Sequence, residues 1–264
     1  MEKECRLERN VEMIFELGEL FCGPGGLACG AKTAQIENSE YKIAHKWAND
    51  YDRDTCDTYI HNICPENPES VICQDVRKLD IGSLSSIDAL AFGFPCNDFS
   101  VVGEQKGFEG EYGPLYTYGV KVLKKYKPKW FLAENVGGLK SANDGGAFKK
   151  ILKDLENAGY ILYPHLYKFE EYGIPQARHR IIIIGIRKDL PFIFRVPSPA
   201  PYADIDNTSR TALEVPPILK DAPNNELTRQ SAIVTERLTH IKPGQNAFTA
   251  DLPSELQLNV KGAK

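Results

Sequence analysis

The chain has 264 residues, of which 42% are hydrophobic and 26% charged, and its formal net charge is -4. This length suits one large domain, or one domain with a small appendage, and the weak acidity excludes a uniformly basic nucleic-acid-binding surface, although not a local basic cleft. No apolar run approaches the ~20 residues that span a bilayer, and residues 1–10 lack the apolar core of a secretion signal. We therefore expect a cytoplasmic protein with no membrane partner.

Short apolar runs alternate with helical stretches from residue 14 to about residue 188. The predicted strands are residues 14–21, 41–48, 71–75, 87–94, 130–134, 160–167 and 180–186. The predicted helices are residues 27–36, 52–61, 115–126 and 147–157. This alternation predicts an α/β fold, with an open, mostly parallel sheet and helices on both faces.

The composition changes after Arg187, since nine of the 17 prolines follow it and the apolar periodicity becomes weak. Such a segment is typical of a linker followed by an irregular region. We predict a catalytic domain over residues 1–190, and a linker with a partial recognition region over residues 191–264.

The first predicted strand runs into a glycine-rich turn that precedes a helix. Gly23, Gly25 and Ala28 fit the G-x-G-x-x-A pattern of dinucleotide-binding turns, although a tight turn that binds nothing is the alternative. Asp50 and Asp75 follow the second and third strands, where carboxylates can bind ribose hydroxyls and an adenine edge. Each acid alone could instead cap a helix or lie in a solvated turn. Together, the three strand ends indicate a cofactor that contains adenosine.

Two residues with catalytic chemistry lie at the ends of the fourth and fifth strands. Cys96 comes after Pro95, which makes the turn rigid, and a thiolate is a strong nucleophile once its pKa is lowered. Glu134 closes an apolar strand, where partial burial would raise its pKa and suit it to proton transfer. A buried structural cysteine and a helix-capping glutamate are the alternatives. Between them, residues 101–113 are rich in glycine and charge, which predicts a mobile loop that closes over substrate.

Arg178 and Arg180 alternate at the start of the last strand and so share a face. Two guanidiniums on one face can bind a phosphate, a carboxylate or a base edge, whereas a solvated strand entrance is the alternative. The seven cysteines include no Cys-x-x-Cys pair, so no metal site is predicted.

Four motifs occur in order: Phe21-x-Gly23-x-Gly25-Gly26, Gly93-Phe94-Pro95-Cys96-x-x-Phe99-Ser100, Glu134-Asn135-Val136 and Gln176-x-Arg178-x-Arg180. This set resembles the bacterial cytosine-5 DNA methyltransferase family over about residues 18–190. The resemblance implies a Rossmann-like sheet that uses S-adenosylmethionine and releases S-adenosylhomocysteine. It also implies duplex DNA as the partner, location on the nucleoid when bound, and a place in a restriction–modification system.

The resemblance also implies a role for each matching residue. The catalytic residues would be the nucleophile Cys96, the proton partner Glu134, and the base and loop anchors Arg178 and Arg180. The implied cofactor-binding residues are Phe21, Gly23, Gly25, Gly26, Asp50, Tyr51, Asp75, Val76, Pro95 and Leu115. The implied substrate-binding residues are Ser100, Asn135 and Gln176.

In the implied mechanism, the Cys96 thiolate adds to C6 of cytosine and so makes C5 reactive toward the methyl donor. Glu134 would hydrogen-bond N3 and the 4-amino group, which relieves charge during the addition. Loss of the C5 proton and expulsion of the thiolate regenerate the enzyme. Because C6 is stacked inside duplex DNA, the base must first be flipped into the pocket.

Some positions depart from the family pattern. Asp50 stands where the family more often has Glu, and Asn97 where Gln is common. Residues 236–246 and 251–253 are similar to the opening of the target-recognition region, but the rest of that region and the later motifs are missing. We therefore expect either a fragment or a second polypeptide that supplies the remainder.

Three other functions stay open from the sequence. The same motifs could serve a tRNA cytosine-5 methyltransferase, although Gly93-Phe94 before the cysteine and the Lys-Pro-Gly segment at 242–244 favour DNA. A cofactor- or DNA-binding subunit that is inactive without a partner is a second alternative. A nicotinamide dehydrogenase is the third, and it leaves Cys96 and Glu134 unexplained.

Overall fold

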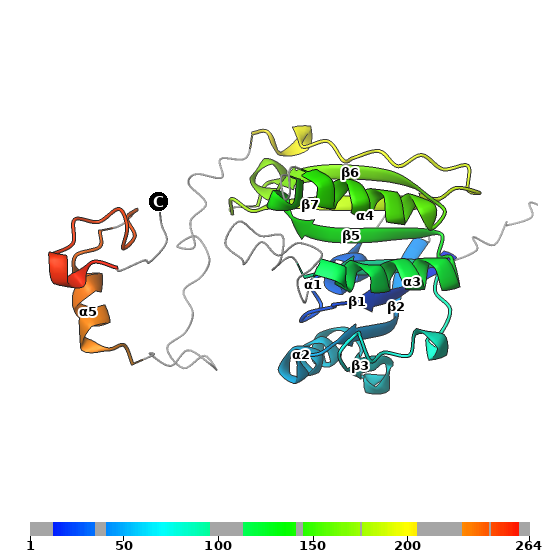
Figure 1. The fold of residues 1–264 in the computed structure, drawn as a ribbon, viewed down its shortest axis with the longest axis horizontal. Coiled ribbons are helices and arrows are strands. Elements are labelled where there is room, and N and C mark those ends of the chain that lie inside the picture. Colours follow the sequence, from blue (N-terminus) through cyan, green and yellow to red (C-terminus); the bar gives the residue numbers. More distant parts are fainter. Residues whose placement is uncertain are drawn as a thin grey trace, which may run out of the picture. The chain divides into compact units, whose positions relative to one another are not determined.

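The computed structural model describes residues 13–34, 41–95, 113–140, 145–174, 176–204, 229–242 and 244–258. The chain divides into two units, Met1–Ser209 and Arg210–Lys264. The predicted boundary after residue 190 stays a prediction. In the first unit, seven strands form one sheet in the order β3-β2-β1-β4-β5-β7-β6 (Figure 1).

The predicted strands and helices are present, and their ends differ from the predicted ones by at most three residues. The strands are β1 (Met13–Leu20), β2 (Tyr41–Asp50), β3 (Val71–Cys73), β4 (Ala89–Gly93), β5 (Trp130–Val136), β6 (Tyr160–Lys168) and β7 (His179–Arg187). The helices of this unit are α1 (Gly26–Thr33), α2 (Arg53–Ile63), α3 (Tyr116–Tyr126) and α4 (Gly146–Asn157).

Strand direction places the site at one edge of the sheet. Strands β1 to β5 pair in parallel, in the combinations β1 with β2 and β4, β2 with β3, and β4 with β5. Strand β7 is antiparallel to both β5 and β6. The carboxyl ends of β1 to β5 therefore lie at the same edge as the amino end of β7.

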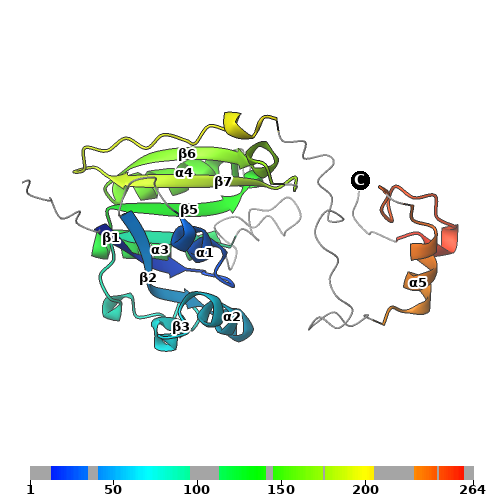
Figure 2. The ribbon, with the colours of Figure 1, turned by 180° about the vertical axis from the view of Figure 1, so that it is seen from behind.

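The helices cover both faces of the sheet, as predicted. Helices α3 and α4 lie on one face, and α1 lies on the other, as the view from behind shows (Figure 2). Strand β4 shows the alternation: Leu90 and Phe92 pack in the main core with α3, whereas Ala91 packs beside Leu27 and Ala31 of α1. Because both faces are buried, the strand is apolar at successive positions.

A separate cluster joins α1 and α2 to the sheet edge near β3. Its buried members are Cys22, Ala28, Ala48, Cys56, Tyr59, Ile63, Cys64 and Val71. Asp52 caps α2, since its side chain accepts a hydrogen bond from the Thr55 amide at 2.8 Å. This cap fixes where α2 begins, directly after the end of β2.

The second unit is described over residues 229–242 and 244–258, and it contains helix α5 (Ala232–Thr239). Arg237 Nε donates a hydrogen bond to the Leu256 carbonyl oxygen at 2.6 Å. Leu252 and Leu256 are buried. The helix therefore packs against the segment that follows it within this unit.

Within these described ranges, no helix is both long and apolar enough to cross a bilayer. The same residues contain no group of three or more histidine, cysteine or acidic side chains arranged to hold a metal.

The close approach of β7 to β5 predicts a large effect at Gly185. A Cβ atom at this position would overlap the Phe131 ring, so we expect Gly185→Ala to lower the free energy of unfolding by about 1–3 kcal/mol. Urea denaturation measures this change. Gly30→Ala is the matched control, because its Cβ would meet no atom within 4 Å in the part of the chain that the structure describes. This change should stabilise α1 by up to ~1 kcal/mol. Equal unfolding midpoints for the wild type and Gly185→Ala would contradict the packing.

Candidate active site

The turn after β1 has an unusual backbone. Phe21, Gly23 and Gly25 have φ angles of 55°, 55° and 97°, all in the left-handed region. A bulky phenylalanine is strained in this conformation, and such strain persists where the surrounding structure enforces it. One side of the turn is open, since Cβ atoms at Gly23 and Gly26 would meet no atom of the described residues within 4 Å. The backbone is therefore accessible to a ligand there.

Asp50, at the end of β2, ties this turn to the neighbouring strand. Its Oδ2 accepts a hydrogen bond from the Gly23 amide at 3.0 Å, and its Oδ1 accepts from the amides of Tyr51 and Asp52 at 2.8 and 3.2 Å. A carboxylate has about four lone-pair positions, so the bonds among the described residues leave one for a hydroxyl group. The adjacent Tyr51 side chain is 77% exposed, which leaves its ring free to stack on a base.

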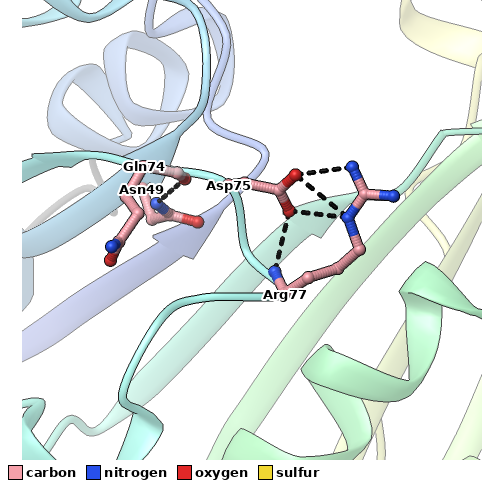
Figure 3. Close-up of polar contacts among 4 residues, drawn as sticks. All are labelled: Asn49, Gln74, Asp75 and Arg77. Atoms are coloured by element: carbon pink, nitrogen blue, oxygen red, sulfur yellow. Dashed lines mark hydrogen bonds and ion pairs between the residues drawn. The ribbon is translucent and has the colours of Figure 1, made fainter.

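The end of β3 is held against β2 by a buried amide (Figure 3). Asn49 Nδ2 donates to the carbonyl oxygens of Ile72 and Gln74 at 2.8 and 2.7 Å, and the Gln74 amide donates to the Asp50 carbonyl oxygen at 2.8 Å. These bonds place the third strand end, which carries Asp75, beside Asp50.

Asp75 forms an ion pair with Arg77 (Figure 3). Arg77 Nε lies 3.0 Å from both Asp75 carboxylate oxygens, and its amide donates to Oδ1 at 2.9 Å. Hydrogen bonds from Arg77 hold the pKa of the Asp75 carboxyl below its ordinary value. The predicted adenine contact must therefore share this carboxylate with Arg77. Val76 is buried in the main core.

Glu134 and Arg180 meet at the end of β5. Arg180 Nε lies 2.8 Å from Glu134 Oε1. Burial raises the pKa of the Glu134 carboxyl above its ordinary value of 4.5, while the charges of Arg180 and Arg178 oppose that rise. A Cβ on Gly93 would lie 3.5 Å from Glu134 Oε2, so this carboxyl lies beside the end of β4. It is therefore close to the turn that leads to Cys96.

Asn135 is buried beside Glu134. Its Nδ2 donates to the Phe94 carbonyl oxygen at 2.9 Å, and its Oδ1 accepts from the Val136 amide at 2.8 Å. The side chain thus holds the backbone directly before Pro95. The substrate contact predicted for Asn135 stays a prediction, and the structure gives the residue a positioning role.

The remaining predicted residues differ in how far the structure describes them. Cys96, Ser100 and residues 101–112 of the predicted loop lie outside the described residues. Pro95 is half-buried, and Leu115 is buried in the main core. Gln176 and Arg178 are exposed before β7. The structure brings together the glycine turn with Asp50, and Glu134 with Arg180.

Asn49 and Arg77 hold the strand ends of the site, although the sequence did not single them out. Asn49 precedes Asp50 at the end of an apolar strand, and a buried amide at that position is a signal for a tether between strands. Arg77 lies two residues after Asp75, within reach of its carboxylate, but only the turn geometry shows that the pair forms.

A model of the C-5 cytosine-specific DNA methylase family matches residues 15–262. The chain belongs to this family. It is 56% identical to Type II methyltransferase M.BbvI of Brevibacillus brevis, over 94% of this chain and 69% of that protein. It is 35% identical to Type II methyltransferase M.NgoFVII of Neisseria gonorrhoeae, over 92% of this chain and 63% of that protein.

Solved methyltransferases share the fold of this DNA methylase. The Dnmt2 methyltransferase of S. pombe superposes with a TM-score of 0.55 over 89% of this chain and 62% of its own, at 16% identity. The Entamoeba histolytica methyltransferase EhMeth superposes with a TM-score of 0.55 over 69% of this chain and 55% of its own, at 22% identity. The predicted family, the Rossmann-like fold and the S-adenosylmethionine-dependent DNA methyltransferase class are thus confirmed.

The described residues of this methylase fit S-adenosylmethionine. The open side of the glycine turn admits close backbone approach, and the free lone pair of Asp50 can accept a ribose hydroxyl. The exposed Tyr51 ring offers a stacking surface at the same sheet edge. The individual cofactor contacts of these residues stay predictions.

The Asp50 contacts predict the effect of removing its carboxylate. We expect Asp50→Ala to lower the free energy of unfolding by about 1–3 kcal/mol, because three amides lose their acceptor. Affinity for S-adenosylmethionine, measured by calorimetry, should fall at least about tenfold, which is ~1.4 kcal/mol. Asp57→Ala is the control: Asp57 is an exposed acid on α2 that pairs with Arg53 at 3.3 Å, and its loss should change stability by less than ~0.5 kcal/mol. Unchanged affinity in Asp50→Ala would exclude Asp50 from the cofactor site.

Proposed function

We propose that this protein transfers a methyl group from S-adenosylmethionine to C5 of a flipped cytosine in duplex DNA, through a covalent bond between Cys96 and C6. One observation carries the proposal: in a chain that matches a cytosine-5 methylase over residues 15–262, a half-buried Glu134 pairs with Arg180 beside Gly93. Gly93 is three residues before Cys96 along the chain.

The cofactor supplies a sulfonium methyl group when it is bound. The Cys96 sulfur forms a bond to C6, and the electron pair of the C5–C6 double bond moves to C5, which takes the methyl group as the methyl–sulfur bond breaks and S-adenosylhomocysteine leaves. Water takes up the C5 proton, and the electron pair of the C5–H bond restores the double bond and expels the Cys96 thiolate. The base leaves the DNA stack for these steps, because C6 is covered within the duplex.

Glu134 assists these reaction steps by donating a proton in a hydrogen bond. Burial favours its neutral form, which can donate a hydrogen bond to N3 as the thiolate adds. Arg180 stabilises the ionised form and holds the carboxyl in place by a charge-assisted bond at 2.8 Å. The two effects oppose each other, and burial is the larger, so the pKa of Glu134 stays above its ordinary value and proton uptake is favoured.

The relatives named above are Type II methyltransferases, which supports a role in a restriction–modification system. We place the protein in the cytoplasm, on DNA. The chain spans 69% and 63% of the two relatives' lengths. A second polypeptide is the proposed source of any recognition residues that this chain lacks.

Transfer of labelled methyl groups from S-adenosylmethionine to unmethylated duplex DNA tests the function. We expect incorporation into DNA, and into bulk tRNA only at background level. If the chain alone is inactive, a polypeptide that corresponds to the remainder of its relatives is added. Binding of the cofactor without incorporation under either condition would overturn the proposal.

Cys96→Ser is expected to abolish methyl transfer, because a hydroxyl group is a far weaker nucleophile than a thiolate. Circular dichroism should show an unchanged fold. Cys29→Ser, which alters an exposed cysteine on α1, is the matched control and should keep full activity. Turnover near the wild-type rate in Cys96→Ser would refute the nucleophile assignment.

Glu134→Gln is expected to slow methyl transfer by about 10²–10⁴-fold, since the amide cannot exchange a proton with N3. Single-turnover kinetics measure the chemical step. Glu156→Gln, at an exposed position of α4, should leave the rate unchanged. A rate in Glu134→Gln within twofold of the wild type would remove this carboxyl from the mechanism.

A further inference from the structure

The strand that leads into the glycine turn carries a buried carboxyl group, Glu19, that has no part in the mechanism above. Glu19, on β1, is 1% exposed, and its Oε1 makes no hydrogen bond within the described part of the chain. Its Oε2 lies 2.5 Å from the hydroxyl oxygen of Tyr59 on α2. No ion pair to Glu19 forms among the residues that the structure describes, so an ionised carboxylate would be a buried charge that they leave uncompensated, which is costly.

A continuous set of short contacts leads away from this pair. The Tyr59 hydroxyl lies 3.1 Å from His45 Nδ1, and His45 Nε2 lies 2.7 Å from Ser70 Oγ. Ser70 Oγ is in turn 2.6 Å from the Asn67 carbonyl oxygen. The contacts connect β1, α2, β2 and the segment before β3.

The number of available protons decides the direction of these bonds. A carbonyl oxygen only accepts, so Ser70 donates to Asn67, and His45 must then donate from Nε2 to Ser70. Neutral His45 has no second proton, so Tyr59 donates to Nδ1. Tyr59 has then used its one proton, and Glu19 must donate to Tyr59. All four bonds therefore form together when Glu19 carries a proton.

One other distribution satisfies the same contacts, with an ionised Glu19 and a protonated His45. It places two charges inside the protein. Burial lowers the pKa of His45 and raises that of Glu19 to about 7, so both groups favour the neutral distribution.

The neighbouring titratable groups do not reverse this preference. The hydrogen bond with Tyr59 lowers the pKa of Glu19, but burial has the larger effect and the pKa stays raised to about 7. The titratable groups that face the cluster are Cys22, His45, Asp50, Cys56, Tyr59 and Cys64, with Lys32 of α1 acting on Cys64. Burial raises the pKa of the Cys22, Cys56 and Cys64 thiols, which keeps them neutral. The negative charge of Asp50 also raises the pKa of the Cys22 thiol.

The ring of Tyr59 connects this network to the glycine turn. A Cβ at Gly25 would lie 3.2 Å from Tyr59 Cδ2 and 2.9 Å from Ile63 Cγ1, so the side chains of α2 pack directly against the turn. Hydrogen bonds that hold the Tyr59 hydroxyl therefore also hold the ring that packs against Gly25.

We propose that Glu19 is protonated in the folded protein below neutral pH and starts a directed hydrogen-bond chain through Tyr59 and His45 to Ser70. This chain positions the glycine turn for the cofactor. The positioning role rests on the proposed function, whereas the protonation of Glu19 does not. Glu19 and Tyr59 act here as positioning residues.

Infrared spectroscopy tests the protonation without any cofactor. At pH 6, we expect a band of a neutral carboxyl group that Glu19→Gln removes and Glu16→Gln does not. Glu16 is the matched control, because it lies on the same strand with an exposed ion pair to Lys46 at 2.7 Å. The absence of any band specific to Glu19 would overturn the protonation.

The pH dependence of stability is the second test. The folded pKa of Glu19, about 7, is above its ordinary 4.5, so the folded state binds more protons between these values. The stabilisation is present at low pH and is lost as pH rises through about 7. Wild type and Glu16→Gln should lose stability over this range more steeply than Glu19→Gln. Equal slopes would contradict the inference.

Cofactor affinity tests the positioning role. We expect Tyr59→Phe to raise the dissociation constant for S-adenosylmethionine about fivefold, with an unchanged single-turnover rate at saturation, and Ser70→Ala to raise it about twofold. Glu19→Gln should stay near the wild type, because its amide also donates to Tyr59. Tyr160→Phe is the control, since that buried hydroxyl donates to the Pro128 carbonyl oxygen, at 2.8 Å, away from the turn.

The outcomes separate this inference from the proposed function. If Tyr59→Phe and Ser70→Ala both bind the cofactor as the wild type does, the positioning role is refuted while the methyltransferase proposal stands. If the wild type itself does not bind S-adenosylmethionine, the proposed function and the positioning role both fail. The infrared and stability measurements then still decide whether Glu19 is protonated.

Discussion

The hydrogen bond from the Gly23 amide to the Asp50 carboxylate is the contact on which the cofactor side of the site depends. It joins the left-handed turn after β1 to the end of β2, and the same carboxylate accepts two further amides that start the connection to α2. Asn49 extends this arrangement to the end of β3. Three strand ends therefore form one rigid edge, because each is held by a polar group of its neighbour.

The catalytic side depends on a reversal of strand direction. Strand β7 is antiparallel to β5, with Val136 opposite Arg180, so the start of one strand meets the end of the other. Arg180 thereby reaches Glu134, which burial alone would hold more firmly in its neutral form. Asn135 secures the backbone before Pro95 from the same strand. Two adjacent residues of β5 thus organise this side: Glu134 pairs with Arg180, and Asn135 holds the turn toward Cys96.

The cofactor side and the catalytic side each contain a glutamate with restricted exposure, and the two glutamates have different partners. Glu134 is compensated by a guanidinium, whereas among the described residues one oxygen of Glu19 contacts a hydroxyl group and the other makes no hydrogen bond. A carboxyl without a cation is most stable when neutral, and one beside a cation can ionise. The two glutamates of one sheet therefore have different protonation chemistry, set by their partners and not by residue type.

The sequence by itself determined the fold class, the order of strands and helices, and the family. Continuous apolar runs at residues 87–94 and 181–186 indicate strands buried on both faces, and the motifs around Gly23, Cys96 and Glu134 are local in the chain. Only the tertiary structure decided which groups pair: Arg180 with Glu134, Arg77 with Asp75, and Glu19 with Tyr59. The physical reason is that periodicity reports local burial, whereas these pairs follow from strand direction, turn geometry and the packing of α2, which join residues between two and 46 positions apart.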